Sequence, residues 1–262
     1  MKSLVLFKRF LNNKTIIVDQ IETYPIAVKE MINANEDIIN KFLTEESKLN
    51  EIKKRENRYG NSVGENLYYK KFNELIFKIY NYLYEHQYNA LIFHATRLLP
   101  EEKDKIKLEG LKAYSREEYL NQKLSILNKY GFNVDEIYNL WKYCLINQED
   151  FNDNYLREKK IYFFYSLNAM AENSVFLLNW GGEVLHKLSL PKIDAVSAPY
   201  ILIKRVNIHD LESFTVQEQI KSHIINKDKV KYKVDASHVF ENDVKIDYIF
   251  ETDEDCLHFK YI

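Results

Sequence analysis

Apolar residues in the first part of the chain follow two different spacings. Short apolar runs at Ser3–Phe7 and Thr15–Val18 predict two short strands. From Ala27 to about Arg58, and again over Leu67–His86, apolar residues recur every three or four positions, which predicts two amphipathic helices. The segment 58–66 between them holds two of the six glycines, so it is the clearest linker.

A compact apolar strand is expected next, at Asn89–His94, and it should stop at the polar residues that follow. A short helix is then predicted from Pro100, because proline suits a first helical turn and two glutamates follow it. Gly110 is expected to cap the end of this helix.

The pattern changes from helical to extended in the second half of the chain. Residues 115–157 are expected to form an inserted helical hairpin, which Ser115 and Glu118 would open as a capping box. Beyond Lys159, aromatic and β-branched residues predict strands at 161–167, 175–180, 181–190, 200–208, 231–240 and 247–251. Helices concentrated before strands predict an α+β fold rather than an alternating βαβ arrangement.

Charge and composition exclude several functional classes. The chain has 37 Lys and Arg against 39 Asp and Glu, so no overall field draws it to nucleic acid or an anionic membrane. Its two cysteines, Cys144 and Cys256, lie far apart and predict a reducing compartment. No stretch approaches the roughly 20 apolar residues of a membrane span, so we expect a cytoplasmic protein.

The sequence also indicates which cofactors to expect. Zinc-site spacing is absent from a set of five histidines, so no metal is expected; these are His186, His209, His223, His238 and His258. The chain contains no GxGxxG and no GxxxxGK[ST] motif, which argues against a Rossmann or P-loop nucleotide site.

Two segments contain the residue types that nucleotide chemistry needs. The first, residues 91–111, brings His94, Thr96 and Arg97 to the expected end of a strand that precedes a helix. The second, residues 161–176, is an Ile-Tyr-Phe strand that leads into a helix of small residues. On spacing alone, a half-buried histidine with an exposed arginine explains the first segment better than a functional site does, and an aromatic core strand is the alternative explanation of the second.

Together, and in this order, the two segments resemble the first two motifs of ADP-ribosyltransferases of the His-Tyr-Glu class. That class includes diphtheria-type toxins and the poly-ADP-ribose polymerases. The resemblance implies NAD as co-substrate, with His94 on a ribose hydroxyl and Thr96 and Arg97 near the rest of the dinucleotide. It also implies that Tyr162 stacks on the nicotinamide, with Tyr165 as the alternative if the register differs.

The third element of the class is an acid, and here the sequence departs from a clean match. Glycosidic cleavage passes through an oxocarbenium-like state, whose positive charge an acid stabilises. Glu218 is the first candidate, because Gln217-Glu218 resembles the Q/E-x-E pattern of many transferases. Glu183, which two glycines precede, is the second candidate and Asp235 the third. A solvated surface acid is the alternative explanation for each.

The resemblance covers about residues 89–250 and implies a split fold of two antiparallel sheets packed face to face, with NAD between them. The expected catalytic domain is 86–262 with the insertion 115–157, and 1–85 forms a mostly helical region packed on it. Proteins of this kind transfer ADP-ribose to a protein or nucleic acid. Many act as bacterial toxins in toxin–antitoxin or anti-phage systems, with a neutralising antitoxin as partner. An NAD glycohydrolase and a non-catalytic binding module are the alternatives.

Overall fold

The computed structural model describes residues 10–55, 64–133, 159–172, 180, 190–226 and 237–251. The chain divides into two compact units. The helical unit comprises Leu11–Ala90 and Val206–Asp235. The sheet unit comprises Met1–Phe10, Leu91–Arg205 and Ala236–Ile262.

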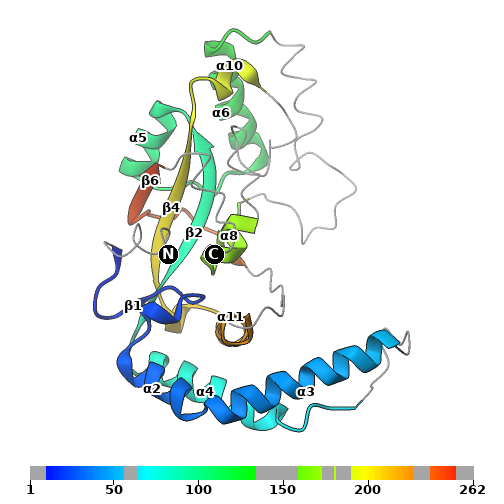
Figure 1. Ribbon diagram of the computed structural model, residues 1–262. Helices are drawn as coiled ribbons and strands as arrows, with labels where there is room; N and C mark the ends of the chain where they lie inside the picture. The colour runs from blue at the N-terminus through cyan, green and yellow to red at the C-terminus, as the bar shows by residue number, and fades with distance from the viewer. Residues whose placement is uncertain are drawn as a thin grey trace. The chain divides into compact units, whose positions relative to one another are not determined.

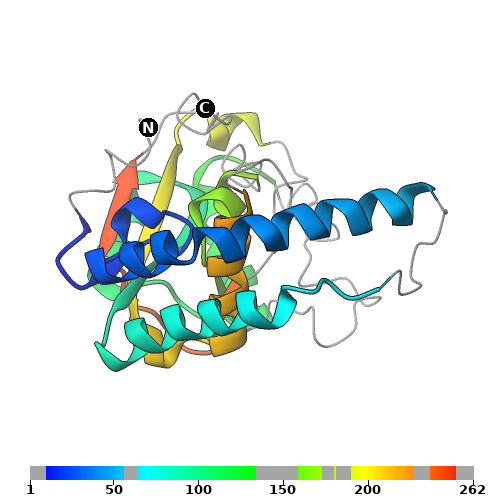
Figure 2. The ribbon, with the colours of Figure 1, turned by 60° about the horizontal axis from the view of Figure 1, so that its bottom comes forward.

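Helix α4 is the centre of the helical unit. The elements of this unit are β1 (Thr15–Ile16), η2 (Ile21–Thr23), α2 (Ile26–Ala34), α3 (Glu36–Arg55), α4 (Tyr69–Glu85), η6 (Ile208–Asp210) and α11 (Ser213–Asn226). Helix α4 packs against α2, α3 and α11 (Figure 2). Its buried face contains Phe72, Leu75, Ile76, Ile79, Tyr80 and Leu83, at the three- and four-residue spacing seen in the sequence.

The expected helix over 27–58 is two helices, α2 and α3, separated at Asn35. The Asn35 amide donates a hydrogen bond to the carbonyl of Met31 at 2.8 Å, and its backbone leaves the helical region with φ −112° and ψ 15°. An asparagine side chain that bonds the last turn of a helix favours its termination there. The single-helix expectation was therefore wrong at this residue.

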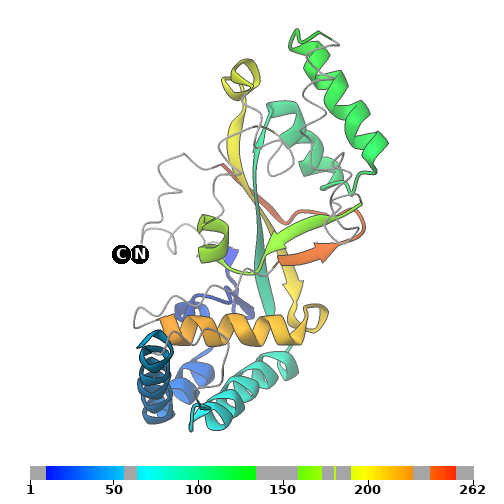
Figure 3. The same cartoon turned by 90° about the vertical axis from the view of Figure 1, so that its right-hand side faces the viewer.

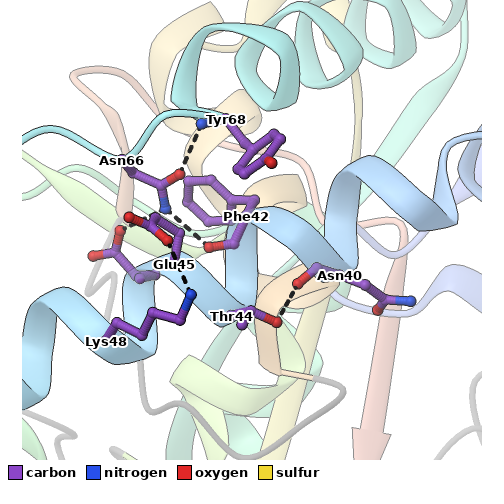
Figure 4. Close-up of polar contacts among 8 residues, drawn as sticks. Asn40, Phe42, Thr44, Glu45, Lys48, Asn66 and Tyr68 are labelled. Carbon is purple, nitrogen blue, oxygen red and sulfur yellow. Dashed lines mark hydrogen bonds and ion pairs between the residues drawn. The ribbon is translucent and has the colours of Figure 1, made fainter.

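The side chain of Asn66 links the start of α4 to the middle of α3 by hydrogen bonds (Figure 4). Its side-chain amide donates to the carbonyl of Phe42 at 2.9 Å and to Glu46 at 3.2 Å, while its oxygen accepts from the backbone N–H of Tyr68 at 3.0 Å. The ring of Phe42 stacks on that of Phe72, with 4.3 Å between the centroids. One buried amide thus satisfies backbone groups of both segments.

The sheet unit contains the strands that follow α4 and the helices that connect them. Its strands are β2 (Asn89–Leu98), β3 (Ile161–Phe164), β4 (Ala198–Asn207), β5 (Ser237–Phe240) and β6 (Tyr248–Glu251). The first two residues of β2 and the last two residues of β4 belong to the helical unit. Its helices are α5 (Pro100–Glu109), α6 (Arg116–Lys129), α8 (Leu167–Glu172) and α10 (Pro191–Asp194).

The described strands form one sheet with the order β5-β3-β2-β4-β6, and β1 also pairs with β2. Figure 1 shows β2 beside β4, with β6 beyond it. The pairs β2–β3, β3–β5 and β4–β6 are antiparallel, whereas β1 pairs with β2 in parallel. Figure 3 shows β3 and β5 side by side, running obliquely to β2.

The α+β prediction is confirmed, but the expectation of two separate sheets is wrong. Strand β2 pairs with β3 on one edge and with β4 on the other, so the described strands are continuous. The β2–β3 pairing sets Phe93 opposite Phe164, a residue 71 positions further along the chain, and no local pattern specifies such a pairing.

Several local predictions are confirmed. Helix α4 and helix α5 lie where the pattern placed them, and Gly110 caps α5 with a left-handed φ of +88°. Ser115 and Glu118 form the expected capping box at the start of α6. The strand expected at 161–167 is present but ends at Phe164, and the small-residue helix follows it from Leu167.

Other expectations need correction or fall outside the described residues. Strand β2 continues to Leu98, so Thr96 and Arg97 lie within the strand rather than after its end. Helix α11 occupies a region for which no helix was expected. The expected elements at 3–7 and 175–179, most of 181–190 and the second helix of the hairpin lie outside the described residues. No helix in the described part of the chain is long and apolar enough to cross a membrane.

Candidate functional site

His94 is a half-buried residue in the middle of β2. Phe93 lies opposite Phe164 on β3, so the antiparallel register sets His94 opposite Phe163 and on the same face of the sheet. The two rings are in contact, with centroids 5.5 Å apart.

The imidazole of His94 is tied to the neighbouring strand through Nδ1. This nitrogen lies 2.8 Å from the backbone oxygen of Tyr162. Because a carbonyl oxygen only accepts hydrogen bonds, Nδ1 must hold the proton. In the neutral ring, Nε2 is then an acceptor, which is the form needed to bind a hydroxyl group.

The two tyrosines singled out by the sequence are placed differently. Tyr162 lies opposite Val239 on β5, whereas its neighbour Phe163 lies opposite His238. Because side chains alternate along a strand, the Tyr162 side chain is on the face opposite to His94, although its backbone contacts His94. Tyr165 contacts His238 on the His94 face, and only 1% of it is exposed.

His238 also lies on this face, although its spacing in the sequence indicated only that it is not part of a zinc site. Its Nδ1 lies 3.4 Å from the Tyr165 hydroxyl, and the two rings are perpendicular. Its ring also meets that of Phe240 at an angle of 80°, with centroids 4.5 Å apart. No local sequence signal identifies His238, because its position depends on the pairing of β3 with β5.

Thr96 and the half-buried Arg97 lie within β2 and contact other residues of the sheet unit. Thr96 is buried. The Arg97 guanidinium donates to the hydroxyl and the carbonyl of Ser197, at 2.9 and 3.0 Å, and to the carbonyl of Asp194 at 2.9 Å. These hydrogen bonds from Arg97 link β2 to the turn that precedes β4.

Of the three candidate acids, the structure describes Glu218. It lies on α11, in the helical unit, whereas His94 lies in the sheet unit. Its carboxylate pairs with Lys221 at 3.3 Å, and the Lys221 ammonium lies 5.1 Å from the Tyr69 ring centroid. Glu183 and Asp235 lie outside the described residues.

The described residues contain no group of three or more His, Cys, Asp or Glu side chains that could hold a metal ion. Comparison of the chain with protein-family models, with curated proteins and with solved structures found no match. The assignment of a function therefore depends on the geometry around His94 and on the motif resemblance.

Proposed function

We propose that this protein is an NAD-dependent ADP-ribosyltransferase whose nucleotide lies against the His94 face of the sheet. The observation that supports it most is the hydrogen bond from His94 to the backbone of Tyr162. It joins the two segments that resemble the first and second motifs of the class. It also sets the neutral ring in the tautomer whose Nε2 is an acceptor, which is the form that a ribose hydroxyl requires. The single α+β sheet is then a variant of the transferase fold.

In this proposal, the bond between ribose C1′ and the nicotinamide nitrogen breaks, and nicotinamide leaves as a neutral molecule. A nucleophile of a protein or nucleic acid forms the new bond at C1′ and releases its proton to solvent. The hydrogen bond from His94 holds the ribose in one orientation while this exchange occurs. By the same resemblance, the protein acts as a bacterial toxin that a partner protein neutralises.

The first test is NAD binding by the His94→Ala variant. Loss of one hydrogen bond is worth about 1 kcal/mol, so calorimetry should show roughly fivefold weaker binding. His209→Ala is the control, because that exposed histidine belongs to the helical unit and contacts the carbonyl of Tyr84. Equal NAD affinity in wild type and His94→Ala would refute the proposed site.

The second test identifies the acceptor. Labelled NAD is incubated with separate pools of protein, RNA and DNA, and the label is followed into each. Label in one macromolecular pool supports transfer. Free ADP-ribose without labelled macromolecule, detected by chromatography, would replace the transferase with an NAD glycohydrolase.

The third test concerns the acid. If Glu218 stabilises the transition state, Glu218→Gln keeps its shape and loses its charge. NAD should still bind, and transfer should fall by roughly a hundredfold or more. Glu183→Gln and Asp235→Asn are measured beside it. A loss of transfer in Asp235→Asn alone would identify Asp235, in the segment that precedes β5, as the catalytic acid.

A further inference from the structure

The face of the sheet that holds His94 contains a second histidine at a fixed separation. His94 lies opposite Phe163 on β3, and Phe163 lies opposite His238 on β5. Neighbouring strands are about 4.8 Å apart, so the two histidines are separated by two such steps, about 10 Å along the sheet. The ring of Phe163 is fully buried between them.

His238 is held in one orientation by aromatic neighbours. The buried hydroxyl of Tyr165 contacts its Nδ1, and the rings of Tyr165 and Phe240 both meet it at close to a right angle, 88° and 80°. Because Nδ1 and Nε2 flank Cε1 in the imidazole ring and point in different directions, a contact of the Tyr165 hydroxyl at Nδ1 directs Nε2 away from that hydroxyl. A half-buried ring fixed in this way is pre-organised to make a polar contact at Nε2.

We propose that His238 is a second NAD-binding residue, which contacts the dinucleotide through Nε2, and that Tyr165 is the residue that positions it. This inference rests on the proposed function. A ligand that reaches both His94 and His238 must be about 10 Å long, which a nucleotide is and a free nicotinamide ring is not. The two histidines therefore select the nucleotide rather than its leaving group.

A direct test uses the wild-type protein. The seven histidines give imidazole resonances that single substitutions can assign by NMR. Titration with NAD should shift the resonances of both His94 and His238 and leave that of His209 in place. Titration with nicotinamide alone should not shift both. A His238 resonance that stays unchanged at saturating NAD, while His94 shifts, would overturn the inference.

Two conservative substitutions separate binding from a structural role. The polar atoms of glutamine lie as far along the side chain as Nε2, whereas those of asparagine lie at the distance of Nδ1. His238→Gln should therefore keep NAD affinity within about twofold, while His238→Asn and His238→Ala should lose about fivefold. Tyr165→Phe, which keeps the ring, should give a smaller loss.

The outcomes distinguish this inference from the proposed function. Retained affinity in His238→Asn with loss in His238→Gln would show that His238 acts only through Tyr165. Wild-type affinity in all the His238 variants, beside a loss in His94→Ala, would overturn the inference alone. If the wild type fails to bind NAD, both fail. Thermal unfolding of each variant shows whether it has kept its fold.

Discussion

Gly110 is a residue for which the structure permits no side chain. Its φ of +88° lies in the left-handed region, where other residues are strained. A Cβ atom at this position would also clash with the carbonyl oxygen of Val244, which accepts a hydrogen bond from Leu111 at 2.8 Å. We predict that Gly110→Ala lowers the free energy of unfolding by about 1–3 kcal/mol in urea titrations.

Gly131 is the matched control for this prediction. Its φ is +79°, but a Cβ atom there would meet nothing within 4 Å. Gly131→Ala should therefore show only the cost of the backbone conformation. An equal loss in the two variants would mean that the contact with Val244 contributes nothing.

Tyr200 gives a prediction about alkaline pH. Tyr200 is buried and its hydroxyl donates to Glu251 at 3.0 Å, and burial, followed by this hydrogen bond and then by the negative charge of Glu251, raises the pKa of the phenol to about 12. Because this value is above 10.0, its ordinary value, the phenol's contribution to stability is fully present below pH 10 and is lost as pH rises through 12. The difference in unfolding free energy between wild type and Tyr200→Phe should thus be flat at pH 7–9 and should fall between pH 10 and 12. A difference that stays constant to pH 12 would contradict this.

At the scale of elements, a buried ion pair joins α5 to α6. Glu102 accepts hydrogen bonds from the backbone of Leu99 at 3.1 Å, from the indole of Trp180 at 2.5 Å and from Lys123 at 2.8 Å. The Lys123 ammonium also lies 4.2 Å from the centre of the Trp180 ring. Only 7% of the Glu102 side chain and 13% of the Lys123 side chain are exposed.

Removing the charge of Glu102 should therefore leave Lys123 buried without its counter-ion. We predict that Glu102→Gln costs about 3–5 kcal/mol of stability and that adding Lys123→Met recovers part of this loss. A double-mutant cycle in urea measures the coupling. The exposed pair Glu101–Lys129 is the control, since Glu101→Gln should cost at most about 1 kcal/mol. Strictly additive losses at the buried pair would refute the coupling.

The elements that the sequence predicted correctly have local signals. Helix α4 has an uninterrupted apolar face, and α5 has Pro100 at its start and Gly110 at its end. Helix α11 was missed because it is buried on more than one side. Its buried residues include polar ones, namely Gln219, Lys221 and Ser222, so apolar spacing does not reveal it.

At the scale of the molecule, the sequence could indicate His94 but not the face to which it belongs. The motif resemblance selected His94 and Tyr162 together, and the backbone contact between them is present. The side of the sheet that each ring occupies depends on strand register, which nonlocal pairing determines. For the same reason His238, 73 residues beyond the tyrosine that it contacts, could not be assigned to the site in advance.

The helical unit joins the beginning of the chain to a segment near its end, and this leads to a prediction about truncation. Helix α11 packs against α4, and the backbone N–H of Ile208 donates to the carbonyl of Tyr88 at 3.0 Å. The buried apolar residues of α11 are Val216, Ile220, Ile224 and Ile225. A chain that begins at Tyr88 lacks α2, α3 and α4, so α11 loses the partners within its own unit.

We therefore expect the chain 88–262 to aggregate in size-exclusion chromatography and to lose near-ultraviolet circular dichroism, because newly exposed apolar surface favours association. Producing residues 1–87 as a separate chain in the same cells should restore a monodisperse complex of the two fragments, since the contacts between α4 and α11 need no covalent link. The first 87 residues would then be an integral part of the fold. A chain 88–262 that remains monomeric and binds NAD as tightly as the intact protein would show instead that they are dispensable.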